Sequence, residues 1–264
     1  MTGHTKSTTK LLNVSVAPLA PKSVEVEYYE TTAVTVLITN NLPTPILVEQ
    51  VILRFQSDAA ASSEFVEQNC GRKLGPKELH EQKIVVCPTP VFLANTNMFD
   101  VMVKFRPIES GTVQGQLSEV HPRLAYLIIR ESTKPCGKLF ISFKQPEDMP
   151  LALQLEKFAR RAGFEPYLAI HDSQPGTGLW KRIEPELLSS VAAAIIWTSH
   201  TEWGEGVQKE VKLARKHKIP EILLLEDRLD PPKEYTGTEI EYLRFDPHNP
   251  APAFSKMLTA RRNI

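Results

Sequence analysis

The sequence predicts two domains of different class, an all-β sandwich followed by a doubly wound α/β domain. In the N-terminal half apolar residues alternate with polar ones at period two, as they do in half-buried strands. In the C-terminal half short apolar runs alternate with helical patterns, which is typical of βαβ units around a parallel sheet. Between the halves, Pro135 and Gly137 disfavour both helix and strand. We therefore expect domains at 1–131 and 138–264, joined by a linker at 132–137.

Composition narrows the class of protein. The 264 residues include 31 acidic and 31 basic side chains, so the net charge of zero gives no electrostatic reason to expect nucleic acid or anionic membrane as a partner. Three widely spaced cysteines, Cys70, Cys87 and Cys136, favour a reducing compartment over a disulfide framework or a metal site. The polar N-terminus has no signal-peptide core, and no apolar run approaches the roughly 20 residues that span a bilayer. A soluble cytoplasmic protein is expected.

The N-terminal half predicts a sandwich of short strands separated by turn residues. The architecture resembles the immunoglobulin type, although the Cys-Trp-Cys hallmark is missing and this half contains no tryptophan. Turns are expected at Asn40–Pro43, Gly71, Gly75–Pro76, Pro88, Pro90 and Gly111. Strands are expected near Val14–Val16, Val24–Tyr28, Val34–Ile38, Ile46–Phe55, Leu79–Val86, Phe99–Phe105 and Leu124–Ile129.

The C-terminal half predicts a flavodoxin-like sheet of five parallel strands with helices on both faces. Asp148 is a candidate helix N-cap, and Gly163 lies where a helix-ending glycine belongs. With strand order 2-1-3-4-5, ligands are expected at the carboxyl ends of the first and third strands. Strands are expected at 138–143, 164–169, 192–198, 220–226 and 242–245, and helices at 151–162, 180–190, 206–217 and 252–262.

Glu210 is the carboxylate that the helical pattern singles out. Val207, Val211 and Ala214 form the inward stripe of the helix at 206–217, and Glu210 lies three residues after the first and four before the last. A carboxylate on or beside a buried face must be paired, hydrogen-bonded or directed into a cavity, because uncompensated burial costs several kcal/mol. The pattern alone leaves open whether Glu210 is functional or pairs with a basic side chain at the rim.

Five segments in order carry a resemblance to a known family: KLFISF, RAGFEPYL, HDSQPGTGLWKRIEPELLSS, AAAIIWTS and GVQKEVKLARKHKIPEILLLE. From Lys138 on, the chain resembles a TIR (Toll/interleukin-1 receptor) domain, nearer to the NAD-cleaving bacterial type than to receptor tails. The resemblance implies that Glu210, followed by Val211, is the catalytic carboxylate of an NAD⁺ nucleosidase. It also implies that NAD⁺ is a substrate rather than a cofactor. The segment Gly176-Thr177-Gly178 is no dinucleotide fingerprint, and a TIR domain needs none.

The end of the first strand supplies candidate substrate-binding residues. Phe143 is a candidate for stacking on a ring and Lys144 for a contact with phosphate, and Gln145 is a further candidate substrate-binding residue. Enzymatic relatives often place arginine after the aromatic residue, so the lysine and glutamine are a departure. An ordinary solvated loop is the alternative interpretation.

Two further segments complete the candidate substrate site. Residues 171–179 correspond to the BB loop of TIR domains, which gates the pocket and mediates contacts between TIR domains; in it, Asp172 and Gln174 are candidate substrate-binding residues. Trp203 precedes the helix of Glu210 and is a candidate to line a ring site, whereas Trp180 is interpreted as a core residue. A metal site is not expected from the isolated His171-Asp172 pair.

The resemblance implies NAD⁺ cleavage to ADP-ribose or a cyclic isomer in immune or cell-death signalling, including anti-phage defence. Activation by self-association of TIR domains is implied too, with the β-sandwich sensing a trigger or recruiting a protein partner. One alternative is a non-catalytic adaptor that scaffolds other TIR domains, in which Glu210 is structural. Another is a nucleoside-processing enzyme of similar fold, resembling deoxyribosyltransferases, which a substrate panel would separate.

Overall fold

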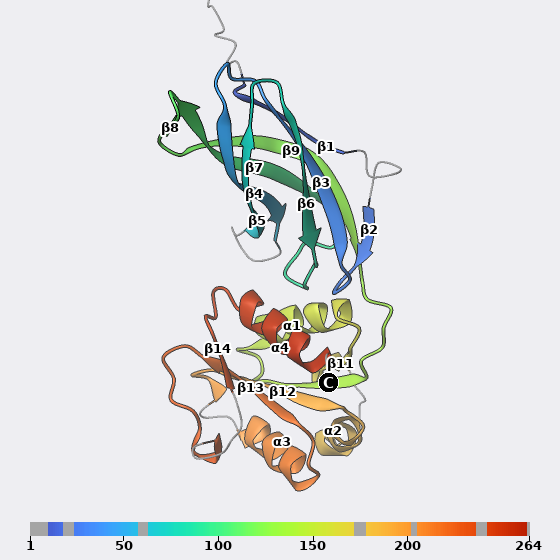
Figure 1. Ribbon diagram of the computed structural model, residues 1–264. Coiled ribbons are helices and arrows are strands. Elements are labelled where there is room, and N and C mark those ends of the chain that lie inside the picture. The colour runs from blue at the N-terminus through green and yellow to red at the C-terminus, as the bar shows by residue number, and fades with distance from the viewer. Residues whose placement is uncertain are drawn as a thin grey trace, which may run out of the picture.

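The structure, a computed structural model, describes residues 10–17, 24–57, 63–171, 178–201, 205–235 and 242–262. Two domains are stacked along one axis, a β-sandwich and an α/β domain (Figure 1). Helices α1 and α4 of the α/β domain lie between its sheet and the sandwich, whereas α2 and α3 lie on the far side of that sheet (Figure 1). No described helix combines the length and the apolar character that crossing a bilayer requires.

The N-terminal domain is a sandwich of two sheets that enclose one hydrophobic core. Buried side chains from both sheets belong to a single cluster that includes Val36, Phe55 and Phe99. One sheet has the order β1 (Leu12–Val16), β3 (Thr32–Asn40), β6 (Leu79–Val86). The other has the order β2 (Val24–Glu27), β9 (Leu117–Arg130), β7 (Asn95–Glu109), β4 (Ile46–Gln56), β5 (Ser63–Leu74), with β8 (Thr112–Val113) paired to β7.

Strand β5 is the long strand that the alternation pattern missed. Its side chains are mostly exposed or half-buried, so it lacks the apolar period of a strand with one buried face. The expected turn at Gly71 is wrong: Gly71 lies within β5 with φ of +63°, where the β4–β5 register shifts opposite Val48–Gln50 and forms a bulge. Strand β2 also runs parallel to β9, whereas every other strand pair described in the sandwich is antiparallel.

The C-terminal domain has the expected strand order. Its parallel five-stranded sheet runs β11-β10-β12-β13-β14, which is the order 2-1-3-4-5. The central strand β12 is buried at every residue, as a strand covered on both faces must be. The strands are β10 (Lys138–Ser142), β11 (Glu165–Tyr167), β12 (Ala192–Trp197), β13 (Glu221–Glu226) and β14 (Tyr242–Phe245), and the α-helices are α1 (Met149–Arg161), α2 (Leu179–Leu188), α3 (Glu205–Lys216) and α4 (Ala251–Arg262).

Helix α1 ends as the sequence predicts but begins differently. Gly163 follows the helix with φ of +89°, a conformation that glycine adopts without strain. Its missing side chain also admits the linker, because a Cβ there would collide with the Lys134 carbonyl oxygen. Asp148 occupies the N-cap position, yet its carboxylate makes no capping bond to the helix.

Specific contacts fasten the two domains together. Val91, from the segment between β6 and β7, is only 4% exposed and belongs to the core cluster of the α/β domain. The buried Arg161 of α1 donates a hydrogen bond of 2.9 Å to the Pro90 carbonyl of the sandwich. The Arg262 guanidinium of α4 lies over the Tyr29 ring, 4.8 Å from its centroid. These contacts join the sandwich to the layer formed by α1 and α4.

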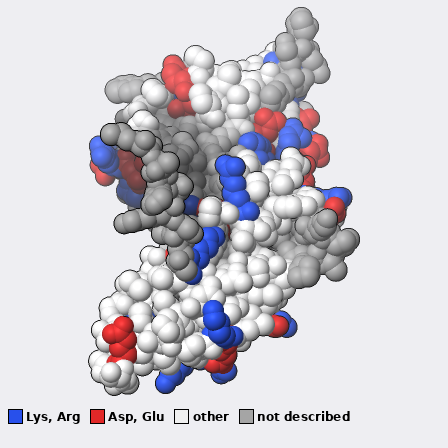
Figure 2. Space-filling view, turned by 90° about the horizontal axis from the view of Figure 1, so that it is seen from above, with Lys and Arg blue, Asp and Glu red and all other residues white. Residues whose placement is uncertain are grey.

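Charged side chains of both signs are interspersed on the surface seen along the long axis of the molecule (Figure 2). Neither sign gathers into a continuous field on that face. This distribution agrees with the net charge of zero.

Candidate active site

Glu210 and Ser142 meet at the carboxyl end of the first strand of the α/β sheet. Val207, Val211 and Ala214 are buried and hold α3 against that sheet. Glu210, half-buried beside them, accepts a hydrogen bond from the Ser142 hydroxyl. Ser142 is the last residue of β10 and is 2% exposed. The helix therefore brings the carboxylate to the sheet edge at which doubly wound folds bind ligands.

The environment of Glu210 shifts its ionisation. Burial raises the pKa of this carboxyl from 4.5 to about 7, and the hydrogen bond from Ser142 opposes part of that rise. A carboxyl that burial shifts toward neutral pKa, at the ligand-binding edge of a sheet, is a candidate for chemistry. Near pH 7 this group exchanges between its acid and its anion, so it can stabilise a developing positive charge or carry a proton.

The other predicted site residues have different surroundings. Phe143 is 8% exposed and packs in the hydrophobic core of the α/β domain, which leaves little ring surface for a ligand. Lys144 is half-buried and Gln145 is exposed, both in the segment after β10. Asp172, Gln174 and Trp203 lie outside the described residues.

A second polar cluster lies at the same end of the sheet, after β12. The Asp148 carboxylate is 2% exposed and accepts a hydrogen bond of 2.8 Å from the Thr198 hydroxyl. It accepts another of 3.3 Å from the Thr201 hydroxyl, and its Oδ1 lies 3.2 Å from His200 Nδ1. Asp148 therefore ties the start of α1 to the segment after β12, across the carboxyl ends of β10 and β12. The sequence indicated only its N-cap position, because these partners are about 50 residues away along the chain.

Ser142 is the other residue whose role sequence reasoning missed. Its position at the end of the first strand could have indicated a role, because side chains there face the ligand crevice of this fold. Its partner lies 68 residues further along the chain. No spacing rule connects residues that far apart.

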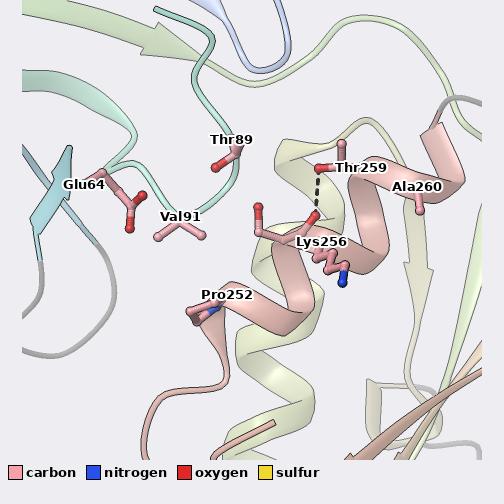
Figure 3. Close-up of a pocket in the computed structure, with 8 residues that line it drawn as sticks. Glu64, Thr89, Val91, Pro252, Lys256, Thr259 and Ala260 are labelled. Carbon is pink, nitrogen blue, oxygen red and sulfur yellow. Dashed lines mark hydrogen bonds between the residues drawn. The ribbon is translucent and has the colours of Figure 1, made fainter. Parts of the chain in front are cut away.

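A cavity of about 490 Å³ lies between the two domains (Figure 3). Glu64 and Thr89 face it from the sandwich, and helix α4 forms the opposite wall (Figure 3). Burial raises the pKa of the Glu64 carboxyl. Since α3 lies on the other side of the sheet from α4 (Figure 1), this cavity does not belong to the Glu210 site. Its lining is Glu64, Thr89, Val91, Pro252, Ser255, Lys256, Thr259 and Ala260.

Comparison with protein families identifies the C-terminal half. The family model described as TIR domain matches residues 139–258, from the second residue of β10 into α4. This part of the chain is a TIR domain. The match assigns residues 139–258 to the TIR domain family and accounts for the five-stranded sheet. It does not decide between an enzyme and a scaffold.

Solved structures contain similar chains. One is the TIR domain of the Toll-related receptor TRR-2 from Hydra magnipapillata, at 16% identity and a TM-score of 0.38, covering 50% of this chain and 100% of that one. Another is the X-ray structure of Northeast Structural Genomics Consortium target SoR45, at 11% identity and a TM-score of 0.29, covering 45% of this chain and 86% of that one. At these scores neither adds to the family match. No curated protein matches the chain.

Proposed function

We propose that this protein is an NAD⁺ nucleosidase, with Glu210 as its catalytic carboxylate. The observation that supports the proposal is the position of Glu210, half-buried at the ligand-binding end of the sheet with a pKa of about 7. A purely structural glutamate on this helix would be expected to pair with a basic side chain. Among the described residues, the hydrogen-bond partner of Glu210 is instead the neutral Ser142 hydroxyl.

The chemistry requires a single carboxylate. The bond between ribose C1′ and the nicotinamide nitrogen breaks, and its electron pair leaves with nicotinamide, which departs neutral because its ring carried a positive charge. Positive charge develops on the ribose, where the Glu210 carboxylate stabilises it. Water then adds at C1′ and its proton passes to Glu210 or to solvent, giving ADP-ribose. Attack by an adenine nitrogen in place of water would give a cyclic isomer.

Self-association is the second element of the proposal. TIR domains typically associate with themselves or with other TIR domains, and we propose that such association activates this one. The sandwich, fastened to α1 and α4, leaves the helix layer of α2 and α3 on the opposite side of the molecule (Figure 1). Assembly through the TIR domain therefore does not require the sandwich to move away.

Nicotinamide release from NAD⁺ tests the proposal. We expect the wild-type protein to release nicotinamide with a specific activity that rises with protein concentration, and kcat/KM to fall as the pH drops below about 7 because Glu210 becomes protonated. Glu210→Gln should abolish release. Glu165→Gln, at an exposed position on β11, is the control and should retain it. No nicotinamide at any concentration, or equal release from Glu210→Gln, would contradict the proposal.

A scaffolding adaptor is the second candidate function, and one observation favours it. The hydrogen bond from Ser142 to Glu210 joins α3 to β10, a contact that would help to hold the helix on the sheet of a scaffold that has no substrate. In that case Glu210→Gln would change stability and leave association with other TIR domains unaltered. Measuring nicotinamide release and association on the same variant separates the two functions.

A further inference from the structure

A groove between α2 and α3 has no part in the site described above. Its volume is about 490 Å³, and the two helices that form it lie side by side beneath the sheet, away from the sandwich (Figure 1). That volume is in the range of small-molecule sites, roughly 300–1,000 Å³. The groove is lined by Trp180, Glu184, Lys209, Lys212, Leu213 and Lys216.

The base of the groove is apolar and anchored in the core. Trp180 and Leu213 are half-buried and pack against a buried cluster that includes Ile183 and Leu187. The indole is therefore held in place by packing while part of it lines the groove. A fixed indole offers a flat surface on which another ring can stack.

The wall formed by α3 carries three lysines on one stripe. Lys209, Lys212 and Lys216 follow one another at spacings of three and four residues, so their side chains are neighbours on the helix. Lys209 lies 3.7 Å from Glu205, whereas Lys212 and Lys216 make no ion pair with any residue in the described ranges. Like charges at this spacing repel one another, and a bound anion would relieve that repulsion.

We propose that this groove binds a nucleotide. The base would stack on the Trp180 indole, and two phosphates would pair with Lys212 and Lys216, whose Cβ atoms are about 6 Å apart at this spacing. Glu184, on the α2 wall, is placed to accept hydrogen bonds from the ribose hydroxyls or an exocyclic amine. The apolar floor with its indole suits the base, and the neighbouring lysines suit two adjacent phosphates. Together these features of the groove match a nucleoside diphosphate.

An acidic peptide is the competing occupant, and the observations favour it less. A peptide helix docks along a groove through apolar anchors repeated over several turns. Here the aromatic surface is a single indole, Trp180, and the free cations lie one turn apart. Those features fit one compact ligand.

Titration with ADP tests the proposal independently of NAD⁺ cleavage. The protein used is the full chain carrying Glu210→Gln, so that ADP binding is measured whether or not the wild type cleaves NAD⁺. Calorimetry should show saturable binding of one ADP per chain, weakened by added salt. Replacing Lys212 and Lys216 together with glutamine should weaken binding by about tenfold or more. Trp180→Leu should weaken it by a similar factor while keeping the floor apolar.

A matched control and a competitor complete the design. Lys181→Gln removes an exposed α2 lysine that does not line the groove, and it should bind ADP as tightly as its parent. Circular dichroism checks that each variant is folded. The proposal is overturned by the absence of saturable binding. It is overturned equally by ADP binding that survives the double lysine substitution, which places the nucleotide elsewhere, or by tighter binding of an oligoglutamate peptide than of ADP.

Discussion

Replacing Glu210 with glutamine should stabilise the folded protein near neutral pH. Burial raises the pKa of this carboxyl from 4.5 to about 7, so the folded chain binds a proton more tightly there than the unfolded chain does. Stability is then lost as the pH rises from about 4.5 to about 7 and stays reduced above that range. Glutamine cannot ionise, and its carbonyl oxygen can still accept the hydrogen bond from Ser142.

The magnitude follows from the shift. A rise from 4.5 to about 7 corresponds to about 3 kcal/mol of lost stability once the group is fully ionised. Glu210 is half-buried rather than sealed from water, which reduces that figure. We expect the stability difference between Glu210→Gln and wild type to grow by about 2 kcal/mol between about pH 5 and about pH 8.

Denaturant unfolding followed by tryptophan fluorescence measures this difference in the right domain. All three tryptophans, Trp180, Trp197 and Trp203, lie in the C-terminal half of the chain. Glu184→Gln serves as the control, since an exposed carboxylate is solvated in the folded and unfolded states alike. If the free energies of Glu210→Gln and wild type differ by the same amount at both pH values, the burial argument is refuted.

Four further predictions concern single residues. Ser142→Ala removes the hydrogen bond that lowers the Glu210 pKa, so the acid limb of the pH profile for nicotinamide release should move to higher pH. Gly163→Ala should destabilise the protein by about 3 kcal/mol in thermal or denaturant unfolding, because it combines a positive φ with a collision. Gly71→Ala, at a similar φ in open space, should cost only about 1 kcal/mol. Arg161→Met should cost about 2 kcal/mol in thermal or denaturant unfolding, since the sandwich loses a charge-assisted hydrogen bond.

The sequence was most informative for elements in which apolar residues repeat at the period of a strand or of a helix. Strands β3 and β6 alternate more buried with less buried side chains and were predicted, whereas the mostly exposed β5 carries no such pattern and was missed. The helical stripe of α3 placed Glu210 beside the buried face, and the structure has it there.

Sequence patterns could not predict hydrogen bonds between residues that are far apart along the chain. Asp148 was predicted as a helix N-cap because an aspartate directly before a helix usually caps it. The sequence pattern is the same when the carboxylate makes no capping bond to the helix, as here. Its partners, Thr198 and Thr201, reach it only because β10 and β12 are neighbours in the sheet. The pairing of Ser142 with Glu210 depends on tertiary packing in the same way.

The burial of Val91 in the neighbouring domain has a consequence for how this molecule could pass on a stimulus. Swinging the sandwich away from the TIR domain would return that side chain to water, at about 1.5–3 kcal/mol, and would leave Arg161 without its carbonyl acceptor. A hinge between the halves is therefore disfavoured. An event at the sandwich would then affect the TIR domain through the number of assembled chains and the distance between them. Bending within one chain would not be needed.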